Sequence, residues 1–452
     1  IIQVPVPKGY SASQIEGETT ASKGFVIYEG DVDWSTILVG DDNSSSTTNT
    51  KIEDTIADET NKESEQTQQD IENDNKVEEN TENIESYENV EEDATDDVIA
   101  DDTATEGTDA TDETKATVTQ QDINIFNLQK SRNQYVWVPV DDPTRIYGVD
   151  SNGKIWGKLY DFSSSGRKAL NWTENNAIMS ITNRNTSYRE PDVVWGTGSY
   201  NAYDTDGYSY MSQYGLGETR YEMLAQELEE NYYEIIASIK KYGGFYIGRY
   251  ETGGLNGTAV VRKMDTNIAS QNWYTMYKKC LTLKGNNDNI KTSMILGNLW
   301  DETIEWLVKS GATNSEGTTL TYYLVGSYST TWGNYKNATF KYIAQNSEKP
   351  EATENKNANS GTRIPTGSAE YTKANNIYDM AGNVRDWTTE ANSTTYRVYR
   401  GGHYYNSGNN YPAAYRNNSV PSNIVDDLRL SRSTLYQIKH SEVLYLNNGI
   451  KA

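Results

Sequence analysis

Residues 376–416 read NIYDMAGNVRDWTTEANSTTYRVYRGGHYYNSGNNYPAAYR, and the two halves of this stretch differ in character. The first half holds a Gly-Asn turn at Gly382-Asn383 and, shortly after it, the large apolar side chain of Trp387. This combination predicts a buried structural segment. The second half begins at Arg400-Gly401-Gly402 and continues in Tyr, Asn, Ser and Gly. These residue types dominate surfaces that contact other molecules.

Two blocks of this stretch resemble the formylglycine-generating enzyme family, also called the sulfatase-modifying factor family. Residues 378–384 (YDMAGNV) match the first block of the family pattern, and residues 397–402 (RVYRGG) match the second. The closing Gly-Phe-Arg of the family is replaced by LRLSR at residues 428–432. Weaker similarity at residues 245–252 and 135–139 extends the resemblance over most of the chain from about residue 130 onward.

The resemblance implies an α+β fold of the C-type-lectin-like type, irregular and rich in loops. Together with the composition it predicts a division of the chain into four parts. These are N-terminal strands of the domain at 1–40, a disordered acidic insert at 41–120, the lectin-like domain at 121–436 and a C-terminal tail at 437–452.

The net charge of −25 is concentrated in the insert, which carries 27 acidic residues and four lysines. A segment with so many charges and so few aromatic residues cannot bury enough apolar surface to fold, so we expect a solvated loop within one domain. The rest of the chain is close to neutral and carries no basic stripe, which argues against nucleic-acid binding.

Local patterns predict several elements. Alternating apolar residues indicate strands, and a period near 3.6 indicates helices. The expected strands are 4–10, 24–28, 133–139 and 245–250, and the expected helices are 218–241, a helix capped by Ser270 that runs through Cys280, and Leu299–Lys309. We expect a loop at 312–362. No run of about 18 apolar residues indicates a membrane span, and Ile1 has the character of an internal cut rather than a natural start.

The residues of this chain argue against the metals of the related enzymes. There, a cysteine pair just after the Arg-Gly-Gly block binds copper, and the matching positions here are Asn406 and Tyr411. Neither side chain is a ligand for Cu(I). The three-histidine iron site of the related sulfoxide synthases cannot be built from His403 and His440 alone. The single Cys280 favours a small buried side chain. We therefore expect no copper, no iron and no catalysis, with a diverged formylglycine-generating-type oxidoreductase as the alternative.

A structural Ca²⁺ ion is implied by the resemblance at the Gly-Asn turn. The ligands would be the side chains of Asp379 and Asp386 and the backbone carbonyls of Gly382 and Val384. Oxygen ligands of this kind suit calcium. The alternative is a turn in which Asp379 accepts hydrogen bonds from backbone N–H groups.

The run from residue 403 to residue 427 resembles the variable region of proteins diversified by retroelements, which use this same scaffold. Its Tyr, Asn, Ser, Asp and His residues are those reached when adenines in AAC-type codons are replaced. The candidate ligand-binding residues are His403, Tyr404, Tyr405, Asn406, Ser407, Asn409, Asn410, Tyr411, Tyr415, Asn417, Asn418, Ser419, Asn423 and Asp426. We expect Arg400, Ala413, Ala414 and Arg416 to point inward. The residues expected to point outward are Tyr404, Tyr405, Asn406, Asn409, Asn410, Tyr411, Tyr415, Asn417, Asn418 and Asn423. The alternative is an Asn/Tyr-rich loop from an A/T-rich genome.

The sequence thus favours a non-catalytic protein that displays a diversified ligand-binding face. Its partner would be a protein or glycan on another cell or phage. Proteins that it resembles are tethered at the cell surface by an N-terminal segment, so we expect an extracellular or cell-surface location. Some of these proteins belong to prophages, and a phage tail receptor-binding protein on the virion surface is the alternative.

Overall fold

The computed structural model describes residues 4–39, 117–143, 147–149, 155–157, 159–160, 181–182, 221–254, 258–265, 271–391, 396–421, 429–431, 433–437 and 443–445. All of these except residue 117 belong to one compact unit. The acidic insert predicted at 41–120 lies outside the described residues, apart from its last four. The chain on either side of it pairs in one sheet, with Val26 opposite Val136.

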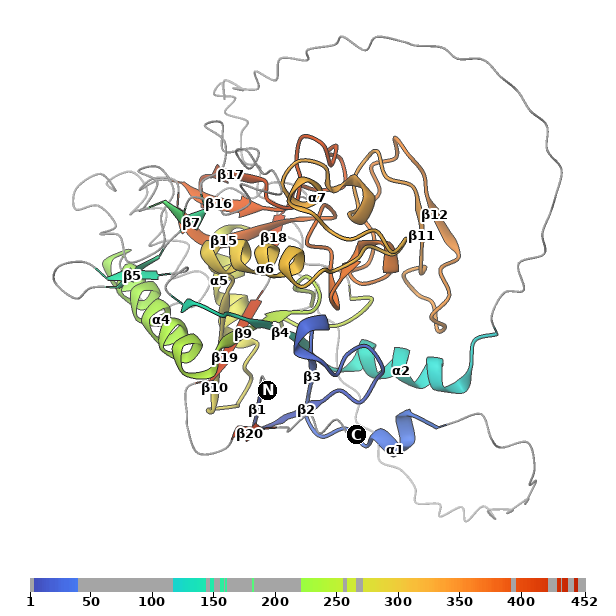
Figure 1. Ribbon diagram of the computed structural model, residues 1–452, viewed down its shortest axis with the longest axis horizontal. Coiled ribbons are helices and arrows are strands. Elements are labelled where there is room, and N and C mark those ends of the chain that lie inside the picture. The colour runs from blue at the N-terminus through green and yellow to red at the C-terminus, as the bar shows by residue number, and fades with distance from the viewer. Residues whose placement is uncertain are drawn as a thin grey trace, which may run out of the picture. The chain divides into compact units, whose positions relative to one another are not determined.

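The unit mixes helices and strands and is rich in loops, as the sequence predicts (Figure 1). The helices are α1 (Trp34–Ile37), α2 (Gln120–Ser131), α4 (Tyr221–Tyr242), α5 (Trp273–Thr282), α6 (Gly297–Lys309) and α7 (Tyr322–Gly326), with 3₁₀ turns η1 (Ala21–Lys23), η3 (Ser329–Trp332) and η4 (Glu370–Thr372). The strands up to the centre of the chain are β1 (Pro5–Pro7), β2 (Tyr10–Ala12), β3 (Val26–Glu29), β4 (Gln134–Pro139), β5 (Tyr147–Val149), β6 (Ile155–Gly157), β7 (Leu159–Tyr160), β8 (Ile181–Thr182), β9 (Gly244–Gly248) and β10 (Ile290–Met294). The remaining strands are β11 (Phe340–Tyr342), β12 (Glu354–Lys356), β13 (Lys373–Ala374), β14 (Ile377–Tyr378), β15 (Arg385–Ala391), β16 (Arg397–Arg400), β17 (Arg416–Ser419), β18 (Arg429–Ser431), β19 (Ser433–Gln437) and β20 (Val443–Tyr445).

The larger sheet has six antiparallel strands in the order β10-β19-β9-β4-β3-β2. Side chains of β4 alternate between its two faces, as a strand requires. Val136 and Val138 join the apolar cluster that includes α4 and α6, whereas Tyr135 and Trp137 pack in a second cluster with the N-terminal strands. The sheet is therefore buried on both faces at its centre, and it draws strands from both ends of the chain.

The smaller sheet carries the motifs that the sequence singled out. Its order is β17-β16-β15-β18, with β15 and β18 parallel. Trp387 on β15 is fully buried, as predicted, and its ring meets that of Tyr399 edge-on at 5.8 Å. The altered closing block forms β18, where Leu430 lies opposite Asp386. The replacement for the usual Gly-Phe-Arg thus still completes the sheet.

Several boundaries differ from the sequence prediction. The N-cap of α5 is Asn272, whose side chain accepts a hydrogen bond from Thr275 N, and not Ser270, which lies outside the described residues. Both residue types cap helices well, so the sequence alone could not choose between them. The predicted loop at 312–362 contains α7, η3 and the β11–β12 hairpin, all too short to show a period.

The predicted C-terminal tail at 437–452 also needs correction, because β20 within it pairs with β1. A three-residue strand gains its hydrogen bonds only from a distant partner, and local sequence does not reveal that partner. The helices α4 and α6 and the strands β4 and β9 lie close to where the sequence predicts them, whereas the helix α2 (Gln120–Ser131) was not predicted. No helix among the described residues is long and apolar enough to cross a membrane.

We expect Trp387→Ala to lower the free energy of unfolding by about 3–5 kcal/mol, as for other buried aromatic side chains. Urea denaturation followed by circular dichroism measures this change. Tyr323→Ala is the matched control, because Tyr323 is exposed and its loss should change stability by less than about 1 kcal/mol. Equal stability of the two variants would contradict the placement of Trp387 in the core.

Candidate ligand-binding surface

The predicted variable segment forms a loop at residues 401–415 between β16 and β17. Gly401 and Gly402 begin it with φ angles of 87° and 71°, in the left-handed region that favours glycine. A Cβ on Gly402 would lie 2.4 Å from the backbone oxygen of Tyr411. The second glycine is therefore required where the chain leaves β16, because both the dihedral angle and the space exclude a side chain.

The two ends of the loop are held by a buried ring of four charges. Arg400 ends β16 and Arg416 begins β17, and the two lie opposite each other in the sheet. Arg416 contacts Asp301 of α6 at 3.0 Å and Glu390 of β15 at 2.7 Å. Arg400 contacts Glu390 at 3.3 Å and also pairs with Asp301. All four side chains are essentially inaccessible to solvent, and their charges sum to zero.

Each charge in this ring has two partners of opposite sign. Burial raises the pKa of Glu390, while Arg416 and Arg400 counteract that rise. Buried ions are tolerated only when close partners replace their lost hydration. Removing any one member would leave each of its two partners with one opposite charge in place of two, so the ring holds β15, β16, β17 and α6 together.

Main-chain hydrogen bonds fix the loop between its ends. Residues 325–336 supply most of the partners. Ala414 N donates to Val325 O at 2.9 Å, Ser329 N donates to Gly408 O at 3.0 Å, and Lys336 N donates to Asn406 O at 2.8 Å. Tyr404 N also donates to Asn383 O at 3.0 Å, within the Gly-Asn turn. These main-chain contacts do not depend on which side chains the loop carries, and side-chain contacts such as Tyr405 N to His403 Nδ1 at 3.2 Å add to them.

Some of the predicted binding residues do face solvent. Tyr405 is 57% exposed, and Asn409 and Asn410 are also exposed. The half-buried members of the predicted set are Asn406, Ser407, Tyr411, Asn417, Asn418 and Ser419. The Tyr405 ring lies directly over Gly361, where an added Cβ would come within 2.2 Å of a ring carbon. The absence of a side chain at Gly361 thus leaves room for this exposed aromatic ring.

Three of the predicted binding residues are buried, and the expectation that Tyr404 and Tyr415 face outward was wrong. His403, Tyr404 and Tyr415 are 5%, 8% and 1% exposed. The Tyr415 ring packs against Tyr411 at 4.8 Å, and its hydroxyl accepts a hydrogen bond from Asn417. Tyrosine serves equally well in a core and on a binding surface, so composition could not separate the two.

The inward-facing residues were predicted correctly, since Arg400, Ala413, Ala414 and Arg416 are all buried. Asn423 and Asp426 lie outside the described residues. Sequence reasoning missed Tyr323 of α7, which is 57% exposed and stacks on Tyr328 at 6.0 Å. Its segment anchors the loop through Val325 and Ser329. The signal that could have indicated it is the cluster of aromatic residues at 322–328.

The positions that match the copper-binding cysteines have other roles. Asn406 Oδ1 accepts a hydrogen bond from His403 N at 3.2 Å, and Tyr411 packs on Tyr415. Cys280 lies buried in α5 among apolar and aromatic side chains, which confirms its interpretation as a small core residue. None of these side chains places a thiolate in the loop.

The Asp379 carboxylate at the Gly-Asn turn already has three protein donors. Its Oδ2 accepts from Thr366 Oγ1 and Gly367 N, both at 2.9 Å, and its Oδ1 accepts from Thr372 Oγ1 at 2.7 Å. These donors fit the alternative of a carboxylate held in a hydrogen-bonded turn, and calcium at Asp379 stays a prediction that they do not test. Calcium at Asp386 with the carbonyls of Gly382 and Val384 stays a prediction.

A comparison with known protein families finds a match over the part of the chain that contains the loop and most of the charged ring. Residues 302–430 match the sulfatase-modifying factor enzyme 1-like domain. The matched range begins one residue after Asp301 and ends within β18, so the region of similarity includes the loop and three members of the charged ring.

No curated protein matches the chain. Among solved structures, the chain is similar to Treponema denticola variable protein 1, with 15% identity, a TM-score of 0.26, and coverage of 43% of this chain and 85% of that one.

We expect Asp301→Asn to lower the free energy of unfolding by about 3–5 kcal/mol, because two buried arginines would each lose a charged partner. Thermal and urea denaturation measure the loss. Glu348→Gln removes the same charge from an exposed position and should leave stability nearly unchanged. A stable Asp301→Asn protein would show that the ring does not hold the loop.

Asp379→Asn should destabilise the protein by the same amount in excess calcium and in EDTA, because its carboxylate is held by protein donors. Melting curves of both proteins under both conditions decide this. A loss of stability that disappears in EDTA would instead make Asp379 a calcium ligand. A lower melting temperature of the wild type in EDTA that Asp386→Ala abolishes would locate calcium at Asp386.

Proposed function

We propose that this protein is a non-catalytic ligand-binding display protein, in which residues 403–426 form a diversified binding surface on a C-type-lectin-like scaffold. The main support for the proposal is that the backbone of the loop and its exposed side chains have separate roles. Its backbone is held by the charged ring and by main-chain hydrogen bonds, whereas Tyr405, Asn409 and Asn410 are exposed, with Asn409 also accepting a hydrogen bond from Thr330 Oγ1 at 3.0 Å.

This division is what a changeable surface requires. Substitutions in a core typically cost several kcal/mol, whereas surface substitutions change stability by less than about 0.5 kcal/mol. A loop whose path is set by main-chain contacts can therefore accept different exposed side chains without refolding. The exposed Tyr405 supplies contact area with few rotatable bonds, and the asparagines supply adaptable hydrogen bonds.

Residue identity supports a role without catalysis. Asn406 and Tyr411 replace the copper-binding cysteines of the resembling enzymes, and the hydrogen bond and ring contact that they make are structural. Among the described residues, no three or more His, Cys, Asp or Glu side chains are grouped so that they could hold a metal ion. A surface of aromatic and amide groups is suited to binding.

The ligand class follows from the chemistry of the surface. Tyrosine and asparagine bind proteins and glycans equally well, so we propose a protein or glycan on another cell or on a phage as the partner. Such a ligand would require the protein to act outside the cell or at its surface.

A pair of libraries tests the proposal before the natural ligand is identified. One randomises the exposed Tyr405, Asn409 and Asn410, and the other randomises the buried Tyr404, Ala413 and Tyr415. Displayed on yeast, members of the first should stay folded, within about 1 kcal/mol of the parent, and should yield binders to a test protein such as lysozyme. Members of the second should mostly unfold. Similar tolerance in both libraries would contradict the proposal.

The diversification itself has a separate test. A reverse transcriptase gene and a near-identical template repeat should lie beside the coding sequence for residues 403–426. Differences between the two copies should fall at adenines of the template. A genomic neighbourhood without them would leave a fixed binding surface and remove the diversification.

A further inference from the structure

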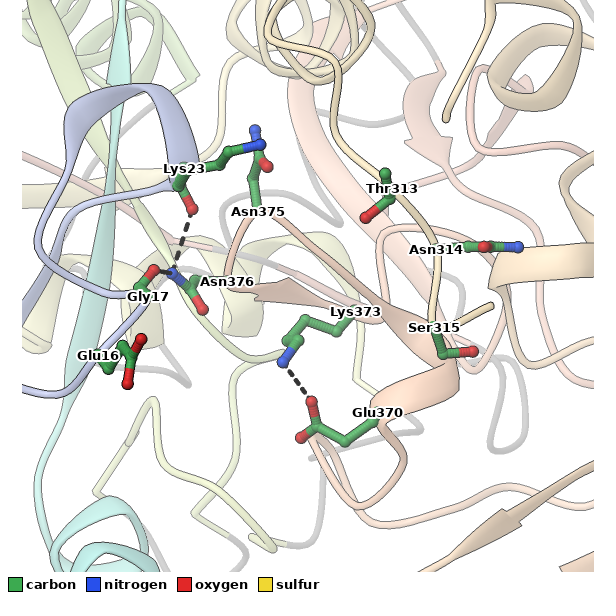
Figure 2. A pocket seen from close by; sticks show the side chains of 10 residues that line it. All are labelled: Glu16, Gly17, Lys23, Thr313, Asn314, Ser315, Glu370, Lys373, Asn375 and Asn376. Atoms are coloured by element: carbon green, nitrogen blue, oxygen red, sulfur yellow. Dashed lines mark hydrogen bonds and ion pairs between the residues drawn. The ribbon is translucent and has the colours of Figure 1, made fainter. Parts of the chain in front are cut away.

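Two adjoining cavities lie away from the loop, in the framework of the unit. The larger, of about 580 Å³, is lined by residues of the N-terminal segment, of 313–315 and of 370–376 (Figure 2). The smaller, of about 320 Å³, is lined by Lys263 and by residues between 315 and 371. Both include Ser315 and Glu370 in their walls. Volumes of this size are typical of small-molecule sites.

The charges at the junction of the cavities do not balance. Glu370 is the shared partner of two lysines: Lys263 Nζ lies 3.6 Å from its Oε1, and Lys373 pairs with its Oε2. The Tyr378 hydroxyl also donates to Glu370 Oε1 at 2.6 Å. Together the cavity walls carry four lysines, Lys23, Lys263, Lys341 and Lys373, against Glu16 and Glu370. The cavity walls therefore carry a net positive charge.

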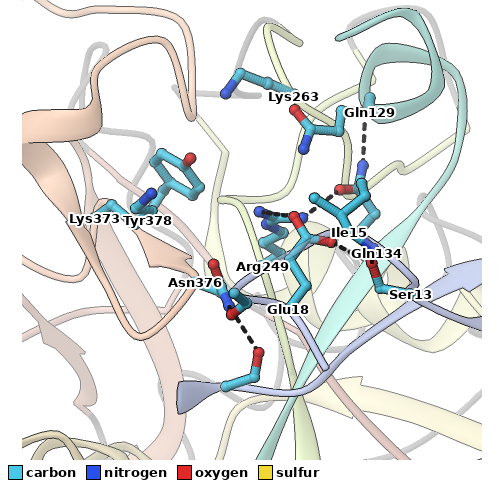
Figure 3. Close-up of polar contacts among 12 residues, drawn as sticks. Ser13, Ile15, Glu18, Gln129, Gln134, Arg249, Lys263, Lys373, Asn376 and Tyr378 are labelled. Atoms are coloured by element: carbon cyan, nitrogen blue, oxygen red, sulfur yellow. Dashed lines mark hydrogen bonds and ion pairs between the residues drawn. The ribbon is translucent and has the colours of Figure 1, made fainter. Parts of the chain in front are cut away.

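The neighbourhood of Lys263 is crowded with cations. Its ammonium lies 5.0 Å from the centre of the Tyr378 ring, and Lys373 lies 5.9 Å from the same ring. Arg249 approaches this ring too, at 5.8 Å, but Glu18 pairs with it at 2.7 Å (Figure 3). Burial lowers the pKa of Lys263; Glu370 opposes this, and Arg249 and Lys373 lower the pKa further. An anion at this point would relieve the repulsion.

The Glu370 carboxylate already interacts with Lys263, Lys373 and the Tyr378 hydroxyl. The Glu370 side chain is 58% exposed, so burial has little effect on it, and Lys263, Lys373 and the Tyr378 hydroxyl hold its pKa below the usual range. The carboxylate therefore stays ionised at neutral pH, and one carboxylate is shared by two ammonium groups. The ionised Glu370 thus balances one of the two ammonium charges, and a net positive charge is left when both lysines are protonated.

The smaller cavity has an aromatic wall opposite polar groups. The rings of Phe340 and Tyr371 stack at 4.6 Å with an angle of 14° between their planes. Ser368, also in the wall, is 1% exposed, and its hydroxyl has no hydrogen-bond partner among the described residues. A buried hydroxyl without a partner is unfavourable, and a ligand that supplies one would be stabilised. Aromatic faces combined with hydroxyl and charged groups suit sugar rings.

We propose that these cavities bind a monosaccharide-sized sugar acid. Its carboxylate lies at Lys263 and Lys373, where the cavities adjoin, and its ring faces Phe340 and Tyr371. The site is separate from the proposed display surface, because none of its lining residues lies in 403–426. Its walls belong to the framework, so the specificity stays constant when the loop changes.

Isothermal titration calorimetry tests this proposal on the full chain with glucuronate, galacturonate and N-acetylneuraminate as probes, and with glucose and acetate as controls. At least one sugar acid should bind, and glucose and acetate should bind at least tenfold more weakly. Binding should weaken as salt is raised, since it depends on charge. If no sugar acid binds, or if acetate binds as well as the best sugar acid, the proposal is overturned.

Variants locate the site. Lys263→Met and Lys373→Met should each weaken binding of the best sugar acid at least tenfold, and Lys349→Met, an exposed lysine outside the cavity walls, should leave it unchanged. Lys263 is buried, so circular dichroism checks that its variant folds; Lys373 is partly exposed and keeps the test decisive if it does not. Unchanged affinity in folded Lys373→Met would overturn the proposal. The loop variants of Tyr405, Asn409 and Asn410 should retain sugar-acid binding, which separates this site from the display surface.

Discussion

The ring of Arg400, Asp301, Arg416 and Glu390 is the constraint on which the candidate surface depends. Buried charges are unfavourable unless the geometry returns the lost hydration energy, and here each charge has two opposite partners. The ring joins residues far apart in sequence, since Arg400 and Asp301 are separated by 99 positions. It therefore holds α6 and the strands β15, β16 and β17 together. Both ends of the loop adjoin this ring of charges, so the loop begins and ends at fixed points whatever side chains it carries.

The remainder of the loop is ordered by a second device. The segment from Val325 to Lys336 offers backbone and hydroxyl groups to the loop backbone, and Trp300 Nε1 donates to Ala413 O at 3.0 Å. These contacts use atoms that every residue except proline has. A scaffold built in this way can hold a loop of variable sequence, because the hydrogen bonds survive substitution. The buried His403, Tyr404 and Tyr415 set the limit of that tolerance, since their side chains fill space inside the framework.

Paired buried charges recur where distant segments meet. Glu18 of the N-terminal segment pairs with Arg249 after β9 and also accepts hydrogen bonds from Ser13 and Tyr28 (Figure 3). Glu251 accepts from Asn383 Nδ2 and Val384 N, which ties the Gly-Asn turn to the same region. In these cases the carboxylate is closely partnered. The junction of the two cavities is different, because two lysines share one glutamate there, and this imbalance makes it a candidate for an anionic ligand.

The sequence by itself determined the elements that have a local cause. Periodic apolar residues predicted the helices near 221–242 and 297–309 and the buried strand at 134–139, and the turn chemistry around Gly382-Asn383 indicated a buried Trp387. Only the tertiary structure decided which tyrosines of the loop face solvent, that Asp301 and Glu390 partner the two arginines, and that residues near the C-terminus pair with β1. The reason is physical. A periodic pattern involves residues that are neighbours in the sequence. Segments that are far apart in the sequence, and that only folding brings together, determine whether a loop side chain is buried, which groups an ion pairs with and what lines a cavity.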